Sequence, residues 1–226
     1  MFRKVSVLVP TRKRLARLET LIQSYRDTLS DPNCVELLFR ADDDDDETKR
    51  HLAHCDCPVL VGPRLDGYRS LPAFFDELRK ASTGDVYLTG NDDMVFRTLG
   101  WAEKILAHAN QYPDGLFCFG VETLNAKNFP FAVVSKRAVE IVGHIHDARL
   151  FWGDVYLRDI MAHFSRAIRI HDVQIDHEWA GHDPDETFAD AKQGESHNWD
   201  DAYWALHRRC VAAAVGKLEA ACLAAH

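Results

Sequence analysis

The chain has 226 residues, and its 46% hydrophobic and 27% charged side chains lie in the ordinary globular range, which argues against disorder over most of the length. The formal net charge of −8 argues against non-specific binding to nucleic acid, which depends on dense lysine and arginine. The apolar run at the N-terminus is far shorter than the ~20 residues that span a membrane, so we expect a soluble, cytoplasmic protein with no stable membrane span.

The first half of the chain alternates short apolar segments with amphipathic ones. Val and Leu residues in 4–10 predict a buried strand that ends at a proline. Apolar residues recur every three or four positions across 14–29, which predicts an amphipathic helix. Further strands are predicted over 35–41, 57–63 and 85–90, and further helices over 47–54 and 70–82. This β-α-β-α-β-α-β order predicts an α/β fold with a largely parallel sheet covered by helices on both faces.

The second half continues the same kind of pattern. Strands are predicted over 115–121, 129–135 and 168–175, and helices over 101–111, 136–145, 154–165 and 200–224. Residues 180–200 between the last strand and the last helix are polar and irregular. No linker rich in Gly or Ser divides the chain, so we expect one domain over 1–226.

Five consecutive aspartates, 42–46, follow the second predicted strand. Ligands of open parallel sheets bind at the carboxyl ends of the strands. Adjacent carboxylates repel one another unless a cation, an arginine cluster or hydrogen-bond donors offset the repulsion. For Asp43–Asp46, a solvated turn that caps the next helix explains the residues equally well. Asp42 is closest to the strand and is the one expected to face a cleft.

Asp92 and Asp93 follow the fourth predicted strand. An Asn-Asp turn is the simplest interpretation, because these residues are common in turns. The apolar residues 94–96 that follow indicate a buried turn instead, and buried carboxylates need a partner. A divalent cation such as Mg²⁺ takes one or two protein carboxylates and leaves its other positions to phosphate oxygens and water. We therefore expect this pair to bind a metal-diphosphate group.

Several segments together resemble a known family. "KVSVLVPTRKR", "VELLFRADDDDDET", "GDVYLTGNDDMVF", "FWGDVYLRDI" and "VQIDHEW" occur in the order and spacing of the inverting GT-A glycosyltransferases of family 2, up to about residue 180. The resemblance implies a GT-A-type αβα sandwich that uses Mn²⁺ or Mg²⁺ and a nucleotide-sugar, usually a UDP-sugar. It divides the domain into a nucleotide-binding half (1–100), an acceptor-side half (101–180), and a loop with the C-terminal helix (181–226).

The resemblance assigns the nucleoside site to two loops. The loop after the first strand, here Pro10, Thr11 and Arg12, would hold the base. Asp42 would lie near the uracil ring. Family members usually carry a pair of aspartates here, and Ala41 stands in the place of the first, which weakens the assignment of uridine.

The resemblance also assigns the phosphate and metal site. "NDD" resembles the DxD-type motif, in which Asn91 replaces the common first aspartate, Asp92 would meet the ribose and Asp93 the metal. The loss of one carboxylate lowers the local charge and loosens metal binding. Arg69 lies where the family often carries a residue near the nucleotide or its phosphates.

Two residues in the second half complete the implied site. Inversion by a single displacement needs a carboxylate that takes the proton from the acceptor hydroxyl, and Asp154, flanked by Trp152, is the candidate base. A helix cap is the alternative role for Asp154. His177 fits the family's metal or diphosphate ligand by position. A structural role for His177 stays open, and His171 and His182 compete with it.

Two other functions remain open. A nucleotidyltransferase of similar layout would form a nucleotide-sugar, although the first loop lacks the glycines of that class. A non-catalytic module could bind a nucleotide-sugar or Ca²⁺, although the aspartate run lacks the alternating ligands of an EF-hand. The acceptor could be a glycan, lipid, protein, small molecule or modified base. Residues 181–200 are suited to acceptor contacts or to a lid.

Overall fold

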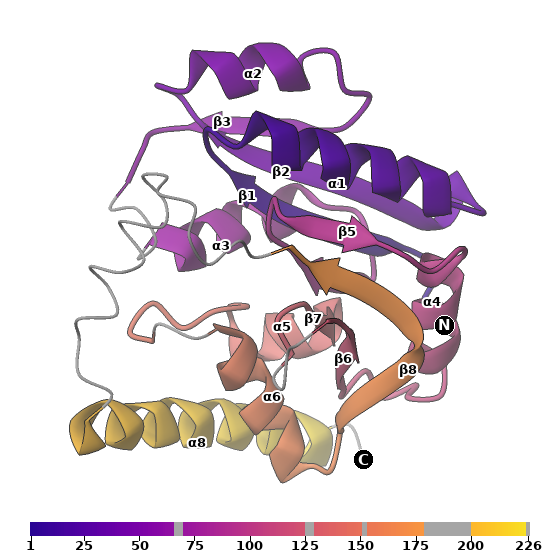
Figure 1. Ribbon diagram of the computed structural model, residues 1–226. Helices are drawn as coiled ribbons and strands as arrows, with labels where there is room; N and C mark the ends of the chain where they lie inside the picture. The colour runs from indigo at the N-terminus through magenta and orange to yellow at the C-terminus, as the bar shows by residue number, and fades with distance from the viewer. Residues whose placement is uncertain (66–69, 125–128, 151–152, 179–199, 225–226) are drawn as a thin grey trace.

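The computed structural model describes residues 1–65, 70–124, 129–150, 153–178 and 200–224 (Figure 1). Its elements in chain order are β1 (Val5–Thr11), α1 (Leu15–Thr28), β2 (Val35–Asp42), α2 (Asp46–Leu52), β3 (Val59–Gly62), α3 (Leu71–Ala81), β4 (Val86–Thr89), β5 (Met94–Phe96), α4 (Trp101–Ala109), β6 (Cys118–Glu122), β7 (Ala132–Ser135), α5 (Lys136–Val142), α6 (Gly153–His163), β8 (Ala167–His177) and α8 (Asp201–Leu223). A short 3₁₀ turn over Pro32–Cys34 precedes β2.

The strands form one eight-stranded sheet in the order β3-β2-β1-β4-β7-β6-β8-β5. Strands β3, β2, β1 and β4 run parallel to one another, and β6 runs parallel to β8. Strand β7 runs antiparallel to its neighbours β4 and β6, and β5 runs antiparallel to β8. The predicted α/β fold with a mostly parallel sheet is therefore confirmed.

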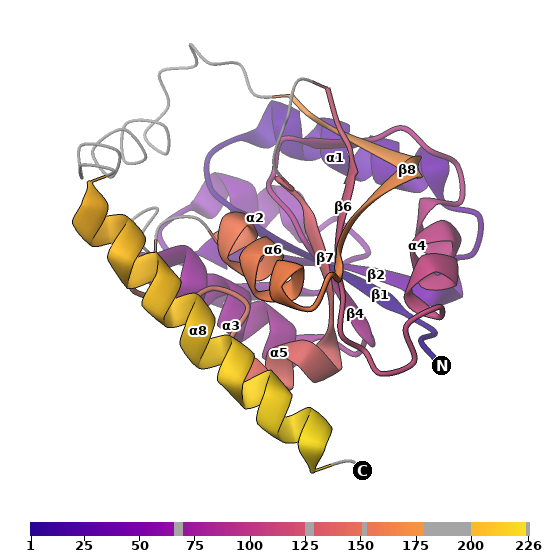
Figure 2. The same cartoon turned by 90° about the horizontal axis from the view of Figure 1, so that it is seen from below.

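Helices cover both faces of the sheet, as Figure 2 shows. Helices α1 and α4 bury their apolar side chains in one hydrophobic cluster on one face. Helices α3, α5, α6 and α8 contribute to a second cluster on the other face, where α8 packs across α5 and α6. The αβα layering expected from the alternating pattern is confirmed.

Strand β1 lies at the centre of the parallel half and explains its stability. Val5, Val7, Leu8 and Val9 are fully buried, because alternate side chains enter the two clusters on opposite faces of the sheet. Full burial of such a side chain contributes about 1.5–3 kcal/mol. This rigid strand delivers its C-terminal loop to the edge where β2 and β4 also end.

One strand was not predicted. Asp92 and Asp93 form the buried turn that the sequence predicts, and the three apolar residues after them, Met94–Phe96, form the short strand β5, which pairs antiparallel with the end of β8. All three residues of β5 are buried. A three-residue apolar run has no measurable periodicity, so only its long-range partner decides that it is a strand.

In the part of the chain that the structure describes, we find no helix long and apolar enough to cross a membrane.

Candidate active site

Asp92 lies in the turn between β4 and β5 and is tied to the loop after β1. It is 4% exposed. Thr11 Oγ1 donates a hydrogen bond of 3.0 Å to Asp92 Oδ2, and Arg14 Nη1 donates one of 3.0 Å to Asp92 Oδ1. These bonds connect the carboxyl ends of two adjacent parallel strands, which is where an open sheet binds ligands.

Asp93 and His177 are brought together by the β5–β8 pairing. Met94 pairs with His177, and the backbone N–H of Glu178 donates to the Asp93 carbonyl at 3.0 Å, which extends the ladder by one step. His177 Nε2 consequently lies 3.2 Å from Asp93 Oδ1. The predicted metal pair is adjacent although 84 positions separate the two residues in the sequence.

Asp93 Oδ1 is buried and accepts no hydrogen bond of good geometry from the described residues. A buried carboxylate oxygen in this state is costly unless a ligand completes it. Two neighbouring ligands of an octahedral ion, each at about 2.1 Å, lie about 3 Å apart, which matches the Asp93–His177 spacing. The described residues contain no cluster of three or more His, Cys, Asp or Glu side chains able to hold a metal. The pair thus fits a cation whose other ligands are water and substrate.

The two aspartates have opposite pKa shifts. Burial raises the pKa of Asp92, and the nearby Asp93 charge adds to that rise against the opposing Arg14. Burial also acts to raise the pKa of Asp93, but His177, Arg14 and Arg17 outweigh it and lower the pKa. Asp93 is therefore the more strongly ionised of the two, as a metal ligand must be.

A pocket of about 120 Å³ opens beside this pair and contains three of the predicted site residues, Asn91, His177 and Asp154. The other lining residues are Leu71, Phe75, Thr89, Pro130, Ile145, His146, Gly153 and Leu157. The pocket is therefore built from the ends of β4 and β8, the N-terminus of α6 and the first turns of α3. Apolar walls with a few polar groups are typical of small-molecule sites.

Asp154 lies in the first turn of α6 and faces this pocket. Burial raises its pKa, although backbone N–H groups at the helix start oppose the rise. Gly153 sets the position of this turn, since a Cβ atom there would lie 2.7 Å from Cγ of the buried His146 ring. A carboxyl group with a raised pKa in a pocket is suited to proton transfer.

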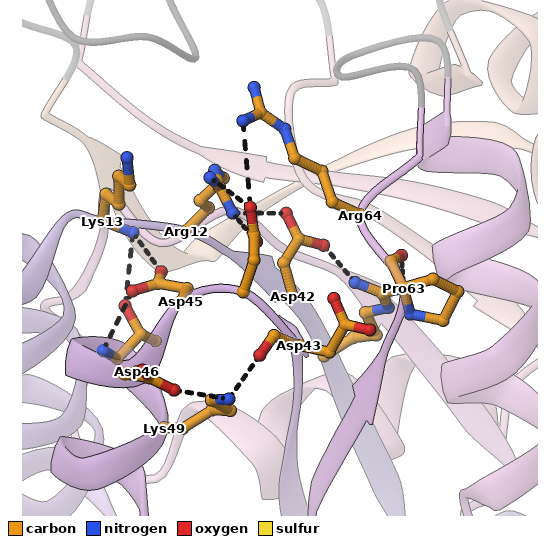
Figure 3. Close-up of polar contacts among 12 residues, drawn as sticks. Arg12, Lys13, Asp42, Asp43, Asp45, Asp46, Lys49, Pro63 and Arg64 are labelled. Carbon is orange, nitrogen blue, oxygen red and sulfur yellow. Dashed lines mark hydrogen bonds and ion pairs between the residues drawn. The ribbon is translucent and has the colours of Figure 1, made fainter.

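Arginine and lysine side chains pair with three aspartates of the run, Asp42, Asp44 and Asp46 (Figure 3). Arg12 forms a bidentate pair with Asp44, with distances of 2.5 and 3.1 Å, and reaches Asp42 Oδ2 at 3.1 Å. Lys49 pairs with Asp46 at 2.8 Å and also bonds the carbonyl of Asp43. Arginine and lysine side chains therefore offset the repulsion that the sequence predicts.

Asp42 also pairs with Arg40, whose side chain is completely buried. The Arg40 guanidinium donates to Glu77 at 3.0 Å and to the Pro63 carbonyl at 2.6 Å, and it stacks 3.9 Å above the Phe74 ring. Asp42 is therefore held by two guanidiniums, and it does not line the pocket that contains His177 and Asp154. Its assignment to the nucleoside base stays a prediction.

Asp45 confirms the capping interpretation at one position of the run. Its Oδ1 accepts from the backbone N–H of Thr48 at 3.2 Å, as the N-cap of α2, and its Oδ2 accepts from the Lys13 N–H at 2.8 Å. We expect Asp45→Ala to lower the free energy of unfolding by about 1–2 kcal/mol. Asp46→Ala, one residue away at an exposed position, is the matched control and should change it much less. Urea unfolding measures both, and equal losses would contradict the capping role.

The remaining predicted residues are placed as follows. Pro10 and Thr11 are the last two residues of β1. Arg69 and Trp152, together with residues 179–199 that include His182, lie outside the described residues. His171 is on the exposed side of β8, where its Nδ1 lies 2.5 Å from Glu122. Of the histidines described, His177 is therefore the one beside Asp93.

Three functional candidates were missed at the sequence level. Arg14 and Arg17 approach the Asp92–Asp93 pair from the start of α1, with Arg17 Nη1 3.7 Å from Asp93 Oδ2. Their three-residue spacing on one helix face is the signal that could have found them. His146, the third, has no distinguishing sequence pattern.

Known structures share this fold at low sequence identity. A Mannosyltransferase, PcManGT from Pyrobaculum calidifontis, in complex with GDP-Man and Mn²⁺, matches with a TM-score of 0.62 and 14% identity over 100% of this chain and 75% of that one. S. aureus TarS matches with a TM-score of 0.62 and 13% identity over 88% of this chain, and TarS 1-349 in complex with UDP with 0.60 and 13% over 76%. This chain spans 41% and 60% of those two chains.

No family model and no curated protein matches the sequence. The similarity is therefore one of structure. At identities of 13–14%, a structural match establishes the fold and not the function. The TM-scores of 0.60–0.62 show that the arrangement of the sheet and its helices is shared with those structures. The chain has the GT-A fold of glycosyltransferases.

Proposed function

We propose that this protein is a metal-dependent glycosyltransferase that transfers a sugar from a nucleotide-sugar to an acceptor hydroxyl with inversion of the anomeric centre. A UDP-sugar is the proposed donor. The observation that carries the proposal is that Asp154 and His177 line one pocket, with the buried Asp93 3.2 Å from His177 Nε2. The GDP-Man and UDP bound to the structural neighbours support a nucleotide-sugar donor.

Asp93 and His177 are the proposed ligands of a divalent cation. Asp93 Oδ1 is buried, accepts no well-aligned hydrogen bond from the described residues and lies 3.2 Å from His177 Nε2, which supports this assignment. An imidazole nitrogen among the ligands favours Mn²⁺ over Mg²⁺, which prefers oxygen ligands. A bound cation would neutralise charge on the departing diphosphate. The Mn²⁺ of the mannosyltransferase neighbour is consistent with this choice.

Asp154 is the proposed general base. Its raised pKa strengthens it as a proton acceptor, and its carboxylate would take the acceptor's hydroxyl proton during attack on the sugar. Asn91 lines the same pocket and can hydrogen-bond the donor. Asp92, held by Thr11 and Arg14, is the proposed contact to the ribose. Pro10, Thr11, Arg12 and Asp42 are the proposed nucleoside contacts. The nucleotide role of Arg69 and the cytoplasmic location stay predictions.

A donor screen tests the function. We expect UDP-sugars incubated with the protein to release UDP in the presence of Mn²⁺, and to release none when the cation is chelated. GDP-sugars serve as the comparison. If the protein prefers them, the proposed glycosyl transfer stands, and only the assignment of uracil as the nucleoside base of the donor changes. Pyrophosphate release from a nucleoside triphosphate and a sugar phosphate would instead favour a nucleotidyltransferase. Binding without turnover across a broad set of acceptors would favour a non-catalytic module.

A further inference from the structure

Two guanidinium groups already neutralise the acidic pair at the proposed metal site. Arg14 Nη1 lies 3.0 Å from Asp92 Oδ1 and 4.0 Å from Asp93 Oδ2. Arg17 Nη1 lies 3.7 Å from Asp93 Oδ2. The side chains of both arginines are mostly buried, at 15% and 17% exposure, so water screens these charges weakly.

Among the described residues, the charges of this pair balance before any ligand binds. Two carboxylates face two guanidiniums, and the His177 ring lies beside Asp93. A dication added to this arrangement meets two positive charges within a few ångströms of the carboxylate it needs. At such distances between weakly screened groups, each like-charge contact opposes binding of the cation. The arginines thus weaken the attraction of the pair for a cation.

A diphosphate changes this balance. It brings negative charge and oxygen acceptors that suit the planar, bidentate geometry of guanidinium groups. Arg14 immediately precedes α1 and Arg17 lies in its first turn, so both also lie near the positive end of that helix, where a phosphate is favoured. Arginines that turn toward phosphate oxygens release the carboxylates to the cation. The same two side chains therefore have a partner in the absence of donor and in its presence.

We propose that Arg14 and Arg17 are positioning residues that make cation binding conditional on the diphosphate: they hold Asp92 and Asp93 when the site lacks donor, and they transfer to the phosphates when donor and cation enter together. This inference rests on the proposed function, since it assumes a diphosphate-bearing donor. Its consequence is an ordered site that binds the free cation weakly.

The experiment measures Mn²⁺ affinity directly, from the electron paramagnetic resonance signal of unbound Mn²⁺, with and without UDP or GDP. Wild-type protein should bind Mn²⁺ weakly alone and much more tightly with one of the nucleotides. Arg17→Gln should bind Mn²⁺ alone about tenfold more tightly than wild type, because one positive charge near Asp93 is gone. Its gain in Mn²⁺ affinity on addition of nucleotide should shrink correspondingly.

Two further variants control for the position of the charge and for side-chain packing. Arg26→Gln removes the same charge from an exposed position of α1, about 13 Å further along the helix axis, and should leave Mn²⁺ affinity unchanged. Arg17→Lys retains the charge and should keep the weak binding of free Mn²⁺, which separates charge from packing. Thermal unfolding of each variant confirms that it is folded. If Arg17→Gln does not fold, Arg14→Gln replaces it in the same measurement.

The outcomes separate the inference from the function on which it rests. If folded Arg17→Gln binds free Mn²⁺ with unchanged or lower affinity while nucleotide still promotes Mn²⁺ binding, the inference is wrong and the proposed function stands. If neither nucleotide promotes Mn²⁺ binding in wild type or any variant, the proposed function itself fails.

Discussion

Replacing Asp154 with asparagine is expected to slow sugar transfer by about 10²–10⁴-fold while nucleotide and Mn²⁺ affinities change little. The amide keeps the size and the hydrogen-bonding outline of the carboxylate but cannot accept a proton at neutral pH. Asp154 lines the pocket without any described contact to Asp93 or His177, so donor and cation sites should survive the substitution. Initial rates of UDP release, together with calorimetric binding of UDP and Mn²⁺, provide the two measurements.

Asp159→Asn is the matched control for this substitution. Asp159 lies five residues further along α6, where its carboxylate contacts Arg158 at 2.7 Å and His207 at 3.0 Å. It does not line the pocket that contains Asp154. The control should retain turnover. If Asp154→Asn keeps wild-type turnover, or if its loss comes with an equal loss of nucleotide affinity, Asp154 is not the base.

The pH profile provides a second check of the same residue. A base works when deprotonated, so the rate should rise with pH as Asp154 loses its proton. Because burial raises the pKa of Asp154, the acid limb of the profile should lie above the ordinary aspartate value of about 3.9. Measurement of kcat/KM against pH reports this pKa in the free enzyme. An acid limb below that value would contradict the assignment.

The fold was largely predictable because its signals are local. Strand β1 and helices α1 and α3 show the periodicity of their elements over enough residues to be recognised, and the alternation of elements then limits the topology. Strand β5 shows the limit of this reasoning. Three apolar residues predict burial, but the antiparallel partner of β5 lies in β8, far along the chain.

The candidate site was predictable only where residue type and strand position agree. Asp93 follows from such a pattern and His177 from the family resemblance, yet their adjacency depends on the β5–β8 register. The aspartate run shows the opposite case. Its composition suggests an ion site, but Arg12 and the buried Arg40 already pair with Asp42. Sequence shows charge, whereas only the fold shows which opposite charge is close enough to cancel it.

Removal of the Asp93 carboxylate is the other change with a large expected effect. Asp93→Ala should weaken Mn²⁺-dependent nucleotide binding by at least about 100-fold, equivalent to about 3 kcal/mol, and abolish transfer. The physical reason is that a divalent cation in this site would lose its charged ligand and keep one neutral imidazole. Calorimetric titration of UDP in the presence and absence of Mn²⁺ measures the loss. The His177→Ala variant keeps the charged ligand Asp93, so excess Mn²⁺ should restore nucleotide binding in that variant. Excess Mn²⁺ should not restore nucleotide binding in Asp93→Ala.

Asp172→Ala provides the matched control, because it removes an aspartate from an exposed position of β8 whose partners are His108 at 2.8 Å and Lys104 at 3.7 Å. It should bind nucleotide and Mn²⁺ as wild type does. Loss of Asp93 also leaves Arg14 and Arg17 with one carboxylate fewer, so each variant needs an unfolding curve to separate binding from stability. A folded Asp93→Ala protein that keeps Mn²⁺-dependent nucleotide binding would show that the cation is held elsewhere, and both the metal assignment and the ordered site inferred from the arginines would fall with it.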